Sequence, residues 1–238
     1  MNKYLLRFSK QGNMRFISHL DLGRLFRRAI KKSEIDIAFS NGYNPHEKMN
    51  IVQPLSLGFE SKSEYLEITT LSPNDPSMIV RLLNTSMPAG IEFYDCKEID
   101  SSINNMSVKT EAALYSVYVK GSPEEYERID VNGFLSQDDI VIKKRDKKTK
   151  TMVDKSVKEM VFGLIKDHCD DTGYFLGLSV KCASNESLNP VNLLTSLYEF
   201  SGMYFVSENS RIKRLDLLTK NIKNEYVSLF EFDKDEDF

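Results

Sequence analysis

The sequence predicts an α+β protein made of two tandem ferredoxin-like domains, each with the element order βαββαβ. Three observations predict this class. The length of 238 residues exceeds that of a usual single domain, residues 1–100 alternate strand and helix patterns in this order, and residues 111–220 repeat the order without repeating the sequence. We therefore expect a first domain at 1–100, a linker at 101–110, a second domain at 111–220 and an acidic tail at 221–238.

The first helix is the best marked element of the chain. Ser18 and Asp21 form the S-x-x-D pattern of a helix start, which makes Ser18 the N-cap and His19 the first helical residue. Apolar side chains then recur at helical spacing, at Leu22, Leu25, Phe26, Ala29 and Ile30. Basic side chains centre opposite that stripe, at Arg24, Arg27, Arg28 and Lys31. We expect the apolar stripe to face a core and the basic residues to form a cationic ridge without interleaved acids.

The other elements of the first domain are marked by alternation and by turn residues. Strands are expected at 3–9, 35–40, 49–52, 65–70 and 91–96. Asp75 followed by Pro76 marks the second helix, because aspartate caps a helix start and proline fits its first turn. The polar residues at 100–109 indicate the linker.

The second domain repeats these signals. Strands are expected at 114–120, 140–144, 152–164, 174–181 and 211–218. Its helices start at Ser122-Pro123, where Glu125 completes a capping box, and at Asn189-Pro190. A lysine-rich turn at 143–150 lies between two of the strands, and we expect it to serve solubility or to protect a sheet edge.

The net charge of −3 conceals a segregation of charge. Residues 1–60 hold ten Lys and Arg but five Asp and Glu, a balance of +5, so the remaining residues total −8. This distribution argues against general coating of nucleic acid but permits a local phosphate-binding patch. The chain has no P-loop, no G-x-G-x-x-G and no G-x-S-x-G, so nucleotide hydrolysis, dinucleotide redox chemistry and serine hydrolysis are not leading interpretations.

The composition also bears on compartment and metal content. No run approaches the length of a membrane span and the first residues lack a secretory signal, so we expect a cytoplasmic protein. The three cysteines, Cys96, Cys169 and Cys182, have neither a disulfide framework nor a metal-binding spacing. Each is expected to be a small buried apolar residue.

Two segments carry candidate binding chemistry. The polar loop at 41–48 contains Tyr43, Asn44, His46 and Lys48, which suit stacking on a base, pairing with a base edge and contact with phosphate. The same residues also suit a solvated turn, in which Asn-Gly supplies the positive φ. His19 is either a ligand contact or general base at the helix start, or a histidine packed beside the apolar stripe. A metal site built from His19 and His46 lacks a diagnostic spacing.

Two motifs resemble a known family. Arg15-Phe16-Ile17-Ser18-His19-Leu20-Asp21, followed by Phe39-Ser40-Asn41-Gly42-Tyr43-Asn44-Pro45-His46, resembles the radical-SAM-linked protein family of bacteria, whose function is unknown. The resemblance continues through Pro54 to Gly58 and Ser63 to Leu66. It implies a partner radical-SAM protein of the cobalamin-binding type, which carries an iron–sulfur cluster and S-adenosylmethionine. This chain has no three-cysteine cluster for such a centre, so we expect no cofactor in the chain itself. A fainter resemblance to tandem ferredoxin-like RNA endonucleases of CRISPR processing suggests an RNA-binding architecture.

Together these observations predict an accessory protein that binds an RNA substrate, tRNA or rRNA, for a partner modification enzyme. The expected RNA contacts are Arg15, His19, Arg24, Arg27, Arg28, Lys31, Tyr43, Asn44, His46 and Lys48. Two alternatives remain open. The first is a protein-binding scaffold for the radical-SAM partner without RNA contact. The second is an RNA-processing enzyme that uses His19 or His46 in catalysis. We lean against catalysis by the isolated chain and expect no metal.

Overall fold

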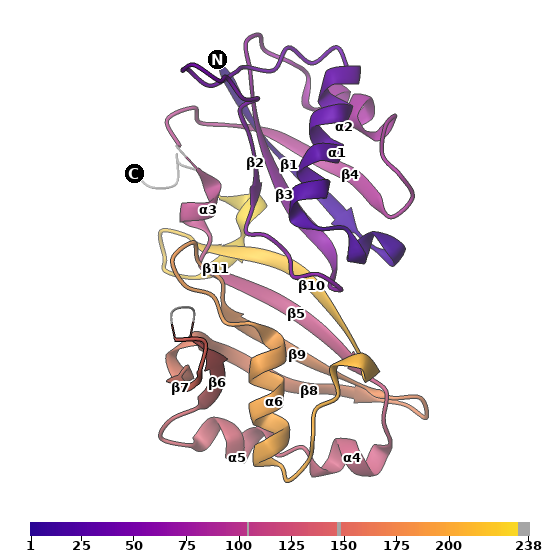
Figure 1. Ribbon diagram of the computed structural model, residues 1–238, viewed down its shortest axis with the longest axis vertical. Coiled ribbons are helices and arrows are strands. Elements are labelled where there is room, and N and C mark those ends of the chain that lie inside the picture. Colours follow the sequence, from indigo (N-terminus) through magenta and orange to yellow (C-terminus); the bar gives the residue numbers. More distant parts are fainter. Residues whose placement is uncertain (104, 147–148, 233–238) are drawn as a thin grey trace. The chain divides into compact units, whose positions relative to one another are not determined.

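The computed structural model describes residues 1–103, 105–146 and 149–232, and it is a mixed α/β protein whose strands pair mostly antiparallel (Figure 1). The expected α+β class is confirmed at this level. The chain forms two compact units, one of residues 1–111 with the chain from Arg214 on, the other of residues 112–213. Lys147, Lys148 and the acidic residues from Asp233 to Asp237 lie outside the described residues.

The first unit follows the expected order of elements. Its strands are β1 (Asn2–Lys10), β2 (Met49–Val52), β3 (Glu60–Thr70), β4 (Ile91–Ile99), β10 (Ser210–Lys220), which begins in the second unit, and β11 (Tyr226–Ser228). Its helices are α1 (His19–Lys32), α2 (Pro76–Asn84) and α3 (Met106–Lys109), with short 3-10 turns η1 (Gly12–Phe16) and η4 (Leu229–Glu231). β1 pairs antiparallel with β4 on one side and β3 on the other, and β2 pairs antiparallel with β3. β10 also lies along β3, and β11 pairs antiparallel with β10.

The core of the first unit lies between its sheet and the two helices α1 and α2. Tyr4, Leu6 and Phe8 alternate along β1 and are fully buried on this face. The rings of Phe8, Phe26 and Phe93 pack together. The ring centroids are 5.0 Å apart for Phe8 and Phe26, 5.2 Å for Phe26 and Phe93, and 5.3 Å for Phe8 and Phe93. Since truncating such a ring costs about 3 to 5 kcal/mol, this cluster fixes α1 on the sheet. The other face of β1 presents the charged residues Lys3 and Arg7.

Helix α1 begins where the capping pattern predicts. The Ser18 hydroxyl accepts a hydrogen bond from the backbone N–H of Asp21 at 3.1 Å and donates to its carboxylate at 2.7 Å. The expected apolar stripe is also confirmed, with Leu22, Phe26, Ala29 and Ile30 buried and Leu25 partly buried. Asp75 caps α2 in the same way, accepting from the backbone N–H of Ser77 at 3.0 Å.

The strand expected at 35–40 is not formed. Only isolated bridges occur there, from Ile37 to Thr70 and from Phe39 to Glu47. The N–H of Ile37 donates to the carbonyl of Ile35 at 2.9 Å, which closes a three-residue turn and removes that N–H from a ladder.

Two segments pack differently from the expected domain ranges. Residues 101–110, expected as a linker, contain α3, and Ile103, Met106 and Thr110 are buried in the first unit. Residues from Arg214 on, expected to close the second domain, also belong to the first unit. The physical reason is an ion pair between Arg214 of β10 and Glu64 of β3, which are 1% and 2% exposed.

The second unit contains a three-stranded antiparallel sheet and a separate hairpin. Its strands are β5 (Ala112–Val119), β8 (Val161–Cys169) and β9 (Tyr174–Lys181), paired in the order β5-β9-β8, and the hairpin strands are β6 (Val141–Arg145) and β7 (Met152–Ser156). Its helices are α4 (Pro123–Arg128), α5 (Val131–Ser136) and α6 (Pro190–Phe200), with 3-10 turns η2 (Lys158–Met160) and η3 (Ser207–Asn209).

The sequence signals of the second unit are largely confirmed. Ser122 and Glu125 form a reciprocal capping box, and Asn189 caps α6 by accepting from the N–H of Val191 at 2.9 Å. The single strand expected at 152–164 is instead two strands, because Val157 and Met160 turn inward at η2 and are buried.

No helix within the described ranges combines the length and apolar character that a membrane crossing requires.

Candidate functional site

The basic side chains of α1 lie on its exposed face. We call Arg24, Arg27, Arg28 and Lys31 the basic ridge, and all four are exposed. Leu22, Phe26 and the rest of the buried stripe hold the opposite face of the helix against the sheet. Asp21 and the three arginines of the ridge border a shallow hollow of about 460 Å³. The ridge is therefore accessible to a large ligand.

The expectation of a ridge without acidic partners is wrong. Arg24 pairs with Asp21 at 2.7 Å, three residues earlier on the same helix. Glu47, from the loop that precedes β2, lies 3.3 Å from the Lys31 ammonium and 3.8 Å from the Arg27 guanidinium. No ion pair involves Arg28 within the part of the chain that the structure describes. Against the two carboxylates, the four cations leave the ridge with a net charge of +2.

Glu47 connects the ridge to the loop at 41–48, which we call the Tyr43 loop. The Glu47 side chain is only 7% exposed, whereas its partners Arg27 and Lys31 are 46% and 67% exposed. A hydrogen bond from its own backbone N–H, followed by the hydrogen bond and charge of Lys31 and the charge of Arg27, lowers the pKa of the Glu47 carboxyl. The carboxylate therefore stays charged and keeps the loop beside α1.

The Tyr43 loop is a closed turn with its side chains in solvent. The N–H of Ser40 donates to the carbonyl of His46 at 2.8 Å, and the N–H of His46 donates to the Ser40 hydroxyl at 3.0 Å. Gly42 has φ of +130°, a conformation that favours glycine. Tyr43 is fully exposed, and Asn44 and His46 are exposed as well. The turn interpretation of this loop is thus confirmed in form, and the turn presents an uncovered aromatic ring.

Arg15 lies in η1 and His19 is the first residue of α1, and among the described residues neither forms a hydrogen bond or an ion pair with the Tyr43 loop. The Arg15 guanidinium stacks on the exposed Phe16 ring at 4.7 Å, and the Arg15 carbonyl accepts from the N–H of Gly58 at 2.9 Å. His19 is exposed rather than packed beside the apolar stripe. Among the described residues, no hydrogen bond links the imidazoles of His19 and His46 to each other or to an acid.

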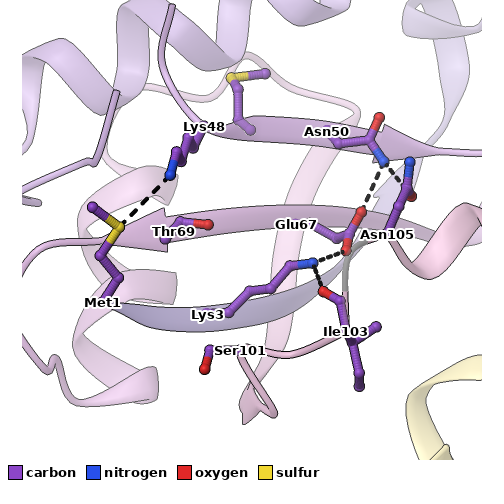
Figure 2. Close-up of a pocket in the computed structure, with 10 residues that line it drawn as sticks. Met1, Lys3, Lys48, Asn50, Glu67, Thr69, Ser101, Ile103 and Asn105 are labelled. Carbon is purple, nitrogen blue, oxygen red and sulfur yellow. Dashed lines mark hydrogen bonds and ion pairs between the residues drawn. The ribbon is translucent and has the colours of Figure 1, made fainter. Parts of the chain in front are cut away.

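The side chain of Lys48 lies on the opposite face of the sheet from the basic ridge. Glu47 and Lys48 are consecutive, so in extended chain their side chains point to opposite faces, and Glu47 points to α1. Lys48 lines a pocket of about 390 Å³ together with Lys3, Asn50, Glu67 and Thr69 (Figure 2). The strand register explains this grouping, since Asn50 of β2 lies directly opposite Glu67 of β3.

The floor of this pocket is a buried polar network that the sequence analysis missed. Lys3 lies 2.8 Å from the Glu67 carboxylate and donates to the carbonyl of Ile103 at 2.6 Å (Figure 2). Glu67 also accepts from the amide of Asn50 at 2.8 Å and from the N–H of Met106 at 2.9 Å. The signal in the sequence was that Lys3 and Glu67 lie within expected strands, each next to apolar residues. The Lys3–Glu67 pair depends on the register of β1 on β3, which sets Lys3 directly opposite Thr69. Glu67 lies two residues from Thr69 on β3 and on the same face, within reach of Lys3.

The described residues contain no group of three His, Cys, Asp or Glu side chains placed to hold a metal ion. The basic hairpin of the second unit is also solvent-facing. Lys143, Lys144 and Arg145 of β6 are exposed, whereas Lys155 of β7 pairs with Glu186 at 2.6 Å.

A family model matches residues 3–190, with the description "Uncharacterized protein conserved in bacteria (DUF2344)". The chain belongs to this family. The matched residues include the basic ridge, the Tyr43 loop and the lining of the pocket of Figure 2 apart from Met1, and the description of the family assigns no activity. No curated protein matches the chain.

Among solved structures, the chain is similar to one titled "Crystal Structure of a Cbf5-Nop10-Gar1 Complex". The identity is 7% and the TM-score 0.49 over 90% of this chain. The match spans 48% of the other chain, so this protein covers about half of that length.

Proposed function

We propose that this protein is an accessory protein that binds RNA through the basic ridge and the Tyr43 loop. The observation that carries the proposal is the Glu47 link, which joins the loop that bears the fully exposed Tyr43 to a helix face with four exposed cations. Cations that meet phosphates and an aromatic ring that stacks on a base are the two components of single-strand recognition.

The ion pairs of the ridge do not oppose this role. Arg24 and Asp21 are 69% and 54% exposed, and exposed pairs of this kind contribute about 0 to 1 kcal/mol. A phosphate that replaces such a carboxylate therefore competes with a weak, solvated contact. Arg28 needs no exchange at all, because no ion pair holds it in the described part of the chain.

Single-stranded or loop RNA suits the Tyr43 loop better than a regular duplex. A-form helices hide base edges in a narrow major groove, whereas unpaired bases are free to stack on an aromatic ring. The Tyr43 ring is fully exposed, and Asn44 beside it offers an amide of the kind that pairs with a base edge.

We further propose that the partner is a radical-SAM protein, which supplies the iron–sulfur cluster and S-adenosylmethionine. The support is the resemblance of the motifs around Arg15 to Asp21 and Phe39 to His46. We also propose a ferredoxin-like classification for the first unit, supported by its βαββαβ order and by the strand order β4-β1-β3-β2 with antiparallel pairs. The corresponding classification of the second unit is supported by the antiparallel strand order β5-β9-β8 with α6 after β9, and the hairpin of β6 and β7 is an addition to the βαββαβ pattern.

The test is a fluorescence anisotropy titration of a short labelled single-stranded RNA, and of total tRNA, at a low and a high salt concentration. The double variant R24Q/R28Q removes two ridge charges, so the slope of log affinity against log salt should fall by about 1.4 on single strands. The matched control is K143Q/K144Q on the exposed hairpin of the second unit, which should leave the slope unchanged. Absence of salt-sensitive binding, or equal effects of the two double variants, would contradict RNA binding by the ridge.

A scaffold function without RNA is favoured by one observation. Phe16, Leu20 and Leu57 are 58%, 70% and 64% exposed, and the Arg15–Gly58 hydrogen bond brings the segments of Phe16 and Leu57 together. Exposed apolar side chains with an arginine are typical of protein interfaces. Co-purification with the partner that survives nuclease and high salt, and that is lost in F16A/L20A, would support this function over RNA binding.

A further inference from the structure

The pocket of Figure 2 lies on the face of the first unit's sheet opposite the core, because Lys3 and Glu67 alternate with the core residues Tyr4, Leu66 and Ile68. We call it the Lys48 pocket, and the residues that line it are Met1, Lys3, Lys48, Met49, Asn50, Glu67, Thr69, Ser101, Ile103 and Asn105. Its volume of about 390 Å³ falls within the range of small-molecule sites.

The side chains that line the pocket carry one positive charge in excess. Lys3 and Glu67 are 10% and 4% exposed and neutralise each other at 2.8 Å. Glu67 is the only carboxylate among the lining residues, and its oxygens are also occupied by Asn50 and the N–H of Met106. Lys48 therefore has no anionic partner within the lining. Its ammonium contacts the Met1 sulfur at 3.7 Å, a weak acceptor that carries no charge (Figure 2).

The other lining groups define what the pocket accepts. Thr69 and Ser101 contribute hydroxyl groups, which donate to an anion, and the thioether of Met1 and the side chain of Ile103 contribute apolar surface. The amide of Asn50 is fixed by Glu67, Asn105 and Ser107 at 2.8, 3.0 and 3.2 Å. A fixed polar floor reduces the entropy that a ligand must remove on binding.

We propose that the Lys48 pocket binds a small organic anion, whose carboxylate or phosphate meets the Lys48 ammonium while its apolar body lies against Met1 and Ile103. The anion takes the place of the Met1 sulfur as the partner of Lys48. Thr69 lies on the same strand face as Glu67, two residues along β3, and its hydroxyl adds a second donor. This site is separate from the basic ridge, so the inference does not depend on RNA binding.

The experiment uses the full chain with its methionine methyl groups labelled with ¹³C. The chain has nine methionines, so Met1 reports on the pocket and the other eight, including Met49 on the core face of β2, serve as internal controls. The probes are phenyl phosphate and benzoate, with benzyl alcohol as the uncharged control. We expect both anions to shift the Met1 methyl resonance in a saturable way, and benzyl alcohol to leave it unchanged. A larger affinity for phenyl phosphate or for benzoate then distinguishes a phosphate ligand from a carboxylate ligand.

Variants separate Lys48 from general charge effects. K48M should weaken binding of the tighter anion at least tenfold, and T69V should weaken it by a smaller factor, since only one donor is lost. K62M is the matched control, because Lys62 is an exposed lysine of β3 outside the pocket lining, and it should leave affinity unchanged. Because Lys48 forms no ion pair within the described residues, the fold should survive in K48M, which an unchanged spectrum of the other eight methionines would verify. No saturable shift with either anion, equal shifts with benzyl alcohol, or equal losses in K48M and K62M would overturn the proposal.

Discussion

The ion pair between Arg214 and Glu64 should be the most sensitive point of the first unit. The two side chains are 1% and 2% exposed and form two hydrogen bonds, of which the one from Nε to Oε1 measures 2.7 Å. A further N–H of Arg214 donates to the carbonyl of Gln53 at 2.7 Å. The perturbation we consider is Glu64→Gln, which keeps the size of the side chain and removes its charge.

The expected loss follows from burial. Removing one partner of a buried ion pair costs about 3 to 5 kcal/mol, since it leaves the other charge without compensation. A second cation makes this loss larger. Burial lowers the pKa of Lys10, the charge of Glu64 opposes that effect, and the charge of Arg214 adds to it. In Glu64→Gln both Arg214 and Lys10 lose their nearby anion.

The assay must distinguish the two units. Because the chain has no tryptophan, we choose hydrogen exchange with mass spectrometry across a urea series. Peptides from β1 and β3 report on the first unit, and peptides from β9 and α6 report on the second. Exchange through unfolding of the first unit should rise roughly a hundredfold to a few thousandfold, while exchange in the second unit stays near wild type.

A double variant and a surface variant complete the design. Arg214→Met with Glu64→Leu removes both charges and should be far less destabilised than Glu64→Gln, because no buried charge is left unpaired. Glu186→Gln, in an exposed pair of the second unit, should leave the first unit unchanged. If Glu64→Gln lowered stability by less than about 1 kcal/mol, the pair would be behaving as a hydrated surface pair and the reasoning would be refuted.

Three further predictions concern single groups. Hydrogen bonds and charges from Lys155 and Lys181 lower the pKa of Glu186 from 4.5 to about 2. The stabilising contribution of Glu186, present above pH 4.5, should therefore be lost as the pH falls to about 2. Glu186→Gln should make the urea midpoint of the second unit less dependent on pH over that range. Burial raises the pKa of the Cys96 thiol to about 12, so iodoacetamide at mildly alkaline pH should alkylate Cys96 only after urea unfolds the first unit, as peptide mass spectrometry would show. Ser122→Ala removes half of the α4 capping box, should cost about 1 kcal/mol, and should raise exchange in the α4 peptide about fivefold, with unchanged exchange contradicting the capping role.

Local signals were sufficient to predict the helices. The caps at Ser18, Asp75, Ser122 and Asn189 each involve a side chain and a backbone N–H within three residues, so the sequence contains the whole interaction. The same holds for the apolar stripe and the ridge of α1, which depend only on helical spacing.

Contacts that depend on strand register could not be predicted in this way. Arg214 and Glu64 are 150 residues apart, so no local pattern assigned the chain from Arg214 on to the first unit. The Lys3–Glu67 pair requires the pairing of β1 with β3, and a shift of one residue would turn every side chain to the other face. For the same reason the loop sequence predicts one binding surface for Tyr43, His46 and Lys48, whereas Lys48 lines a pocket on the opposite face from Glu47.

In the first unit, exposure distinguishes the ion pair that holds the fold together from the ion pairs that a ligand can reach. Arg214 and Glu64 are almost inaccessible, so exchanging either partner for a ligand would require unfolding. The pairs of the ridge differ, because Arg24, Arg27 and Lys31 are 69%, 46% and 67% exposed. Only Glu47 is buried among them, and it belongs to the loop rather than to the helix. In the proposed RNA contact, a phosphate therefore meets Arg24 and Arg28 without moving the scaffold, whereas Arg27 and Lys31 stay paired with Glu47, whose charge repels the phosphate and limits affinity. That balance is consistent with a transient contact, which the proposed transfer of an RNA substrate to a partner enzyme would require.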